Sequence, residues 1–169
     1  MRRPVLFLGL GSAALLAAAV PALWLAVTPG SIAALPKQMP SVRGIELLRD
    51  RAGSGALTPV EIVTDTGIGR GVTTPEYRRA LGRLTDSIFH DREAYIVASG
   101  RRPPYVDAGS RYGRVFVIAR HEYGAAESQA LVSRIRSVHV PRGRFAGSAH
   151  VYVGGAPAQG ADYLARSYA

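Results

Sequence analysis

The sequence predicts an α+β protein with one N-terminal transmembrane helix followed by a single α/β domain. Two observations predict this class. A run of 24 uncharged residues, 4–27, lies near the start of the 169-residue chain. After residue 60, apolar residues recur with period 2 or with helical spacing, in the order strand, helix, strand, strand, helix, strand. A chain of this length allows one ordinary domain.

Residues 1–29 are predicted to form a short cytoplasmic start and a transmembrane helix. The uncharged run of 24 residues would form a helix roughly 36 Å long, and a bilayer core is about 30 Å thick. Arg2 and Arg3 precede this run, whereas Lys37 is the next charge after it. The positive-inside rule therefore places the N-terminus in the cytoplasm and the residues after 28 on the extracytoplasmic side.

A cleaved signal peptide is the alternative interpretation of the same segment. Arg2 and Arg3 would form its basic start, and Ser31-Ile32-Ala33 its cleavage site. The apolar part of a signal peptide is typically about 7 to 15 residues long. The longer run found here favours an uncleaved anchor, and both interpretations export the rest of the chain.

Residues 30–40 are expected to form a linker, because prolines and small residues interrupt them. The exported domain is expected at 41–156. Its first helix is predicted over 41–52, because Ser41 can cap it and apolar residues recur three or four positions apart, at Val42, Ile45, Leu48 and Ala52.

A strand and a second helix follow. Residues 60–65 alternate with period 2 and predict a half-buried strand that ends at a glycine-rich turn. Thr73-Thr74-Pro75-Glu76 is a strong helix start, because a threonine oxygen can cap the first amides and proline is tolerated in the first turn. One face of this helix is apolar over four turns, at Tyr77, Ala80, Leu81, Leu84 and Ile88.

The second half of the domain contains two strands, a helix and a final strand. Strands are predicted over 93–99 and 114–120, and the second is apolar on both faces and therefore central in the sheet. The strand over 150–153 is the last. Between them a helix is predicted over 126–138, closed by Pro141, with four residues directed inward: Ala130, Leu131, Ile135 and Val138.

The predicted order, βαββαβ, is the split βαβ pattern of ferredoxin-like domains. Right-handed crossovers would place both helices on one face of a four-stranded sheet. The remaining segment, 157–169, predicts a helix that leads back to the membrane.

The composition excludes several classes of protein. The chain has 20 Arg, one Lys and 12 acidic residues, for a net charge of +9, but the arginines are scattered and we expect no nucleic-acid partner. Recurring aliphatic residues and tyrosines exclude a disordered protein. The lack of cysteine in the sequence excludes a disulfide-bonded or cysteine-ligated zinc fold.

No motif predicts catalysis, a metal or a cofactor. The segment 67–71, GIGRG, lies between a strand and a helix but matches neither GxGxxG nor a P-loop. A Ser/His/Asp triad lacks its G-x-S-x-G elbow, and nothing fixes the separation of Asp86 and Asp91. We therefore assign no catalytic, cofactor-binding or metal residue and expect no enzyme. The histidines have no metal-ligand spacing and are expected to be ordinary surface residues: His90, His121, His139 and His150.

A series of short motifs accompanies the apolar span and the predicted domain: Arg2-Arg3-Pro4, Thr28-Pro29-Gly30, Ser41-Val42-Arg43-Gly44, Ala56-Leu57-Thr58-Pro59, Val153-Gly154-Gly155 and Asp162. Their order and spacing resemble the MMPL transporters of the resistance-nodulation-division superfamily. The similarity covers essentially the whole chain and matches one membrane span with one porter domain.

The resemblance implies part of a proton-motive-force-driven exporter of lipidic or hydrophobic molecules in the bacterial plasma membrane. It implies as partners a remaining transmembrane bundle, a second porter domain, the lipid bilayer and a hydrophobic substrate. The family's proton relay lies in later spans, and residues 4–27 contain no ionisable side chain. We therefore expect the chain to be one part of a longer transporter.

A small exported binding or interaction domain, membrane-anchored or secreted and without transport activity, is the alternative function. Tyr95 and Tyr152 bear on this choice. They could line an uncovered sheet face against another domain or a hydrophobic substrate, or they could pack against the helix over 41–52.

Overall fold

The computed structural model describes residues 4–21 and 38–167. Helix α1 (Pro4–Ala19) covers 16 residues of the predicted membrane span, and positions 22–27 of that span lie outside the described residues, together with most of the predicted linker. Among the helices in the described ranges, none is both long and apolar enough to cross a bilayer. The transmembrane helix over 4–27 is therefore not confirmed and stays a prediction.

The α/β domain contains the other elements. They are α2 (Pro40–Ala52), η3 (Ser54–Leu57), β1 (Val60–Asp65), η4 (Gly71–Thr73), α3 (Pro75–Phe89), β2 (Ala94–Ser99), β3 (Tyr112–Ala119), α4 (Ala126–Arg134), η5 (Ile135–His139), α5 (Val140–Gly143), β4 (His150–Gly154) and α6 (Ala156–Ser167). Every strand and helix predicted after residue 41 is present, with ends that differ by a few residues.

The four strands form one antiparallel sheet in the order β2-β3-β1-β4. In its centre, Ile62 of β1 pairs with Val115 of β3 on one side and with Val153 of β4 on the other. The connection through α3 joins β1 to β2 past β3, and the connection through α4 joins β3 to β4 past β1. This is the strand order of the predicted split βαβ pattern.

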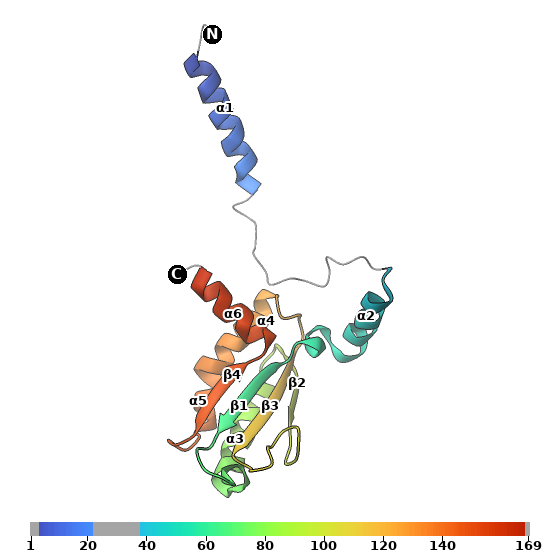
Figure 1. The fold of residues 1–169 in the computed structure, drawn as a ribbon, viewed down its shortest axis with the longest axis vertical. Coiled ribbons are helices and arrows are strands. Elements are labelled where there is room, and N and C mark those ends of the chain that lie inside the picture. The colour runs from blue at the N-terminus through green and yellow to red at the C-terminus, as the bar shows by residue number, and fades with distance from the viewer. Residues whose placement is uncertain (1–3, 22–37, 168–169) are drawn as a thin grey trace.

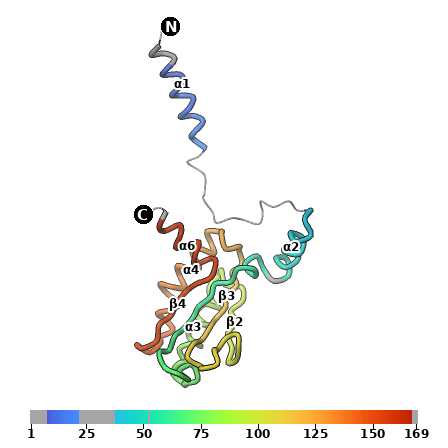
Figure 2. The backbone as a smooth tube through the Cα atoms, viewed as in Figure 1, coloured from blue at the N-terminus to red at the C-terminus, as the bar shows by residue number. Residues whose placement is uncertain are grey.

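One face of the sheet packs against the helices, which lie behind the strands in Figures 1 and 2. Successive strand residues point to opposite faces, and on this face the side chains of β1 and β3 are completely or almost completely buried: Val60, Ile62, Val115 and Val117. The helices contribute the other half of the core, from Leu84, Ile88, Leu131, Val132, Ile135 and Ala158. Helices α3 and α4 therefore share one face, as the sequence predicts.

Helix α3 begins where the sequence predicts. Thr74 Oγ1 accepts a hydrogen bond from the Tyr77 backbone N–H at 3.3 Å, and Pro75 lies in the first turn. Glu76 places a negative charge near the helix N-terminus, where the helix dipole favours it. The predicted apolar face is buried at Tyr77, Ala80, Leu84 and Ile88, and Leu81 is partly buried.

The helix predicted over 126–138 is expected to close at Pro141, and this expectation is wrong. Helix α4 continues through the π-helical turn η5 into α5, so helical structure extends past Pro141 to Gly143. Pro141 lies just after the π-helical turn, near the start of α5, and supplies no N–H to the helical hydrogen bonds.

The π-helical turn also changes which residues face the core. Its extra residue per turn shifts the phase of the residues that follow it. Within the turn, His139 is 5% exposed as a whole residue, whereas Val138 is only partly buried. Ala130, predicted to point inward, is exposed, and Ser128, two positions before it, is fully buried. The inward positions Leu131 and Ile135 are confirmed.

Smaller differences concern element ends. Helix α2 begins at Pro40 with Met39 as its N-cap, so the predicted Ser41 cap is wrong, and Figure 2 shows this helix standing away from the sheet. Strand β3 begins at Tyr112, two residues before the predicted start, because it pairs with Asp65 at the end of β1. The C-terminal helix α6 follows β4 directly and packs against α4.

Candidate functional site

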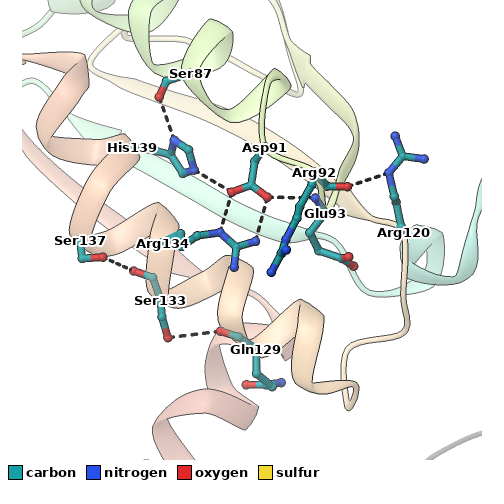
Figure 3. A network of polar contacts seen from close by, with 10 residues as sticks. All are labelled: Ser87, Asp91, Arg92, Glu93, Arg120, Gln129, Ser133, Arg134, Ser137 and His139. Carbon is teal, nitrogen blue, oxygen red and sulfur yellow. Dashed lines mark hydrogen bonds and ion pairs between the residues drawn. The ribbon is translucent and has the colours of Figure 1, made fainter.

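A network of buried polar side chains joins the C-terminal end of α3 to α4 and η5 (Figure 3). Asp91 lies just after α3 and its side chain is only 5% exposed, and the side chain of His139 in η5 is 7% exposed. Arg134 of α4 completes the centre of the network. These partners lie 43 and 48 residues after Asp91 in the chain, so no local sequence pattern links them.

The Asp91 carboxylate accepts four hydrogen bonds. Oδ1 accepts from Arg134 Nη2 at 2.8 Å and from the Glu93 backbone N–H at 2.9 Å. Oδ2 accepts from Arg134 Nε at 2.7 Å and from His139 Nε2 at 3.1 Å. The Arg134 guanidinium holds the pKa of Asp91 well below its usual value, although burial opposes this. An ionised carboxylate has about four acceptor positions, so none remains for base catalysis.

The same contacts settle the hydrogen positions on a neutral His139 ring. Ionised Asp91 can only accept, so Nε2 carries the hydrogen, and Nδ1 accepts from the Ser87 hydroxyl at 2.8 Å. A hydrolase triad uses the opposite nitrogens, with aspartate on Nδ1 and serine on Nε2. This serine, histidine and aspartate therefore act as a clamp that holds α3 against η5.

A second buried acid, Glu93, ties the start of β2 to the end of β3. Its carboxylate is 6% exposed and accepts from both the backbone N–H and Nδ1 of His121, each at 2.9 Å. Among the four histidines predicted to be surface residues, His90 and His150 are exposed and His121 is half-exposed. The prediction is wrong for His139.

The glycine-rich segment after β1 forms a turn whose backbone amides donate hydrogen bonds within the protein. The Gly67 N–H donates to Asp65 Oδ1 at 2.8 Å, and the Arg70 N–H donates to the Gly109 carbonyl at 3.0 Å. These amides are therefore not directed at a phosphate, in agreement with the turn that the sequence predicts. Within residues 4–21 and 38–167, no three His, Asp or Glu side chains gather as metal ligands.

The sheet face opposite the helices is called the open face here. Strand register places eleven residues on it: Glu61, Val63, Asp65, Ile96, Ala98, Tyr112, Arg114, Phe116, Ile118, His150 and Tyr152. In the described part of the chain, α3, α4 and α5 lie on the other side of the sheet (Figure 1). Tyr152 is 59% exposed and Tyr112 is 42% exposed, so the open face presents aromatic surface.

Arginines neutralise the acids of the open face. Arg111 binds both carboxylate oxygens of Asp65, at 2.7 and 2.8 Å, and lowers its pKa to about 2. The Arg114 guanidinium lies 3.5 Å from Glu61 and 5.3 Å from the centre of the Phe116 ring. The open face therefore combines aromatic and apolar residues with acids that are paired to arginines.

The two tyrosines singled out from the sequence have different surroundings. The Tyr95 ring lies beside Gly53 at the end of α2, and the Arg120 guanidinium is 5.6 Å from the ring centre. Tyr152 has the His150 ring as its aromatic neighbour, at 6.4 Å. Tyr95 thus packs near α2, whereas Tyr152 is available on the open face.

Two cavities flank α3. Cavity A has a volume of about 430 Å³ and lies between α3 and the loop that joins β2 to β3. Cavity B has a volume of about 420 Å³ and lies between α3 and the segment after α5. Tyr77 lines both cavities and separates them. Ser87, Asp91 and His139 line neither cavity, so the polar network stands apart from both.

Comparisons with known proteins give no assignment. No protein-family model matches the chain, and no curated protein matches it. The resemblance to MMPL transporters therefore stays a prediction.

Proposed function

We propose that the α/β domain is an extracytoplasmic porter domain of a proton-motive-force-driven exporter of lipidic or hydrophobic molecules, of the kind that the MMPL resemblance implies. The open face carries the proposal. A ferredoxin-like sheet with one helix-covered face and one aromatic face favours a partner, because monomeric domains rarely expose large contiguous apolar patches. The partner we propose is a second porter domain, with the hydrophobic substrate passing along their shared surface.

The apolar N-terminal segment supports a membrane location. Leu15 and Leu16 of α1 are more than two-thirds exposed, and transfer of such side chains from water to a bilayer is favourable. Residues 4–27 contain no ionisable side chain, so we assign proton coupling to other spans of the transporter.

The size and extraction of the native product test the proposal. Source-cell membranes are washed with carbonate and blotted with an antibody against residues 41–155. We expect a wash-resistant band several times heavier than 18.0 kDa. A wash-resistant band near 18.0 kDa would contradict the exporter and favour a small anchored binding domain. A slightly smaller, wash-released band would favour the secreted form of that alternative.

Photo-crosslinking tests the open face directly. Benzoylphenylalanine replaces Tyr152 on the open face or Phe89 on α3, and both positions are aromatic and about equally exposed, at 59% and 65%. Irradiation of cells should give a crosslink to a porter domain from position 152 and none from position 89. Equal crosslinking from the two positions, or none from 152, would contradict a partner on the open face.

A further inference from the structure

Cavity A combines an apolar lining with positive charge. Its apolar and aromatic lining comes from η4, α3 and the loop after β2: Val72, Tyr77, Leu81, Tyr105 and Val106. Three arginines also line it, Arg78, Arg101 and Arg114, and its described lining residues include no Asp or Glu. Its volume of about 430 Å³ is within the range of small-molecule sites.

Two of the three arginines already have partners. Arg114 forms an ion pair with Glu61 at 3.5 Å, and Arg78 donates to the Thr73 carbonyl at 2.9 Å. The carboxylate of Asp107, next to the lining residue Val106, accepts from the backbone N–H groups of Gly109 and Tyr112, at 2.9 and 2.7 Å. Among the described residues, Arg101 has no hydrogen-bond or ion-pair partner, and it is exposed.

Cavity B provides the contrast. It is also lined by three arginines, but Arg79 pairs with Glu76 at 3.1 Å and Arg83 donates to the Gly143 carbonyl at 2.9 and 3.2 Å. The lining of cavity B thus includes an acid, Glu76, beside its arginines. No Asp or Glu is among the described residues that line cavity A, and Arg101 is its lining cation without a partner among those residues.

We propose that cavity A binds a small organic anion with an apolar body, such as an aromatic carboxylate or sulfonate. The apolar body fills the space between α3 and Tyr105, and the anionic group lies near Arg101. A low-dielectric wall strengthens the attraction of a lining cation such as Arg101 for an anion. The inference concerns this cavity alone and holds whether or not the domain belongs to an exporter.

A matched pair of probes separates charge from shape. The full chain, solubilised in detergent, is titrated with 1-naphthalenesulfonate and with neutral 1-naphthalenesulfonamide, and binding is followed by ligand-observed NMR. The sulfonate should bind saturably with a Kd of about 1 mM or tighter, and the sulfonamide should bind at least threefold more weakly. Equal affinity for the two probes, or no saturable sulfonate binding in the millimolar range, would overturn the proposal.

Two arginine variants locate the site. Arg101→Gln removes a lining charge, and Arg142→Gln removes an exposed charge on α5 that does not line cavity A. Arg101→Gln should weaken sulfonate binding about two- to fivefold, the range for one exposed charge pair, and leave sulfonamide binding unchanged. Arg142→Gln should change neither Kd. Equal effects of the two variants would show a general response to net charge and would overturn the site.

Discussion

At the scale of single residues, the polar clamp at the end of α3 is the feature that sequence reasoning missed. From the sequence, nothing fixes the separation of Asp91 from Asp86, and its partners Arg134 and His139 lie 43 and 48 residues away. One local signal points to the burial of His139. His139 is four and eight positions after the buried Ile135 and Leu131, which is an inward helical phase. The π-helical turn that completes this burial has no sequence signature.

Removal of the clamp's central acid should destabilise the domain. Asp91→Asn leaves the partly buried Arg134 without a carboxylate. It should lower the free energy of unfolding by about 3 kcal/mol, the low end for a broken buried pair, because the Arg134 side chain is 31% exposed. Urea denaturation measures the change. Asp86→Asn is the control, since Asp86 is 75% exposed, and its effect should stay within about 0.5 kcal/mol. Equal effects would contradict the clamp.

The loss of stability at low pH should depend in part on the Asp65–Arg111 ion pair. The pKa of Asp65 is lowered to about 2 in the folded state, whereas an aspartate in an unfolded chain has a pKa of about 3.9. Below about pH 4, Asp65 therefore binds a proton in the unfolded chain but stays ionised in the folded protein. The free energy of unfolding accordingly decreases as the pH is lowered. Asp65→Asn should flatten this fall between about pH 4 and pH 2.

Denaturation curves at several pH values measure that slope. Asp50→Asn on α2 is the matched control, because Asp50 is exposed and should leave the slope unchanged. Parallel curves for Asp65→Asn and the unsubstituted protein would contradict the folded-state role of the pair.

At the scale of elements, local patterns predict most helices and strands of the domain, but they predict the ends of these elements less accurately. The period-2 run of β1 and the Thr74-Pro75 start of α3 are local signals, and both elements occur where expected. Pro141 is also a local signal, but the π-helical turn before it changes its position in the helix. Element type therefore follows from short-range chemistry, whereas phase and length depend on packing.

The N-cap of α3 should contribute measurable stability. Thr74→Ala removes the acceptor for the Tyr77 N–H and should lower the free energy of unfolding by about 1 kcal/mol. Thr85→Ala lies within the same helix, where the hydroxyl only donates back to the Leu81 and Gly82 carbonyls, and it should change stability by less than about 0.5 kcal/mol. Thermal or urea unfolding of both variants tests the difference, which would vanish if the cap were unimportant.

The turn from β4 into α6 requires glycine at position 155. Gly155 has φ of +89°, and an added Cβ would lie 2.4 Å from the Pro59 carbonyl oxygen. Gly155→Ala should therefore destabilise the domain by more than about 1 kcal/mol. Gly82→Ala on α3 meets nothing within 4 Å and should stabilise it by up to about 1 kcal/mol. A tolerated Gly155→Ala would contradict this geometry of the turn.

At the scale of the whole molecule, the order of elements was predictable and the functional surface was only partly so. The βαββαβ order and right-handed crossovers imply a sheet with helices on one face, and the observed strand order agrees. Which tyrosines remain on the other face depends on where α2 packs, so the sequence does not distinguish Tyr95, which lies beside Gly53, from the exposed Tyr152. Cavity A does not follow from the sequence either, because its three arginines come from separate segments.

The central proposal is that the α/β domain lies on the extracytoplasmic side of the membrane. Cysteine labelling in intact cells tests this location most directly. The chain has no cysteine, and an added side chain at Gly147 meets nothing within 4 Å, so Gly147→Cys provides a clean reporter. A cysteine inserted directly after Met1 is its cytoplasmic counterpart and keeps both N-terminal arginines. A membrane-impermeant maleimide should label position 147 in intact cells and the inserted cysteine only after permeabilisation. Labelling of the inserted cysteine alone, or protection of position 147 until the cells are opened, would contradict an exported porter domain.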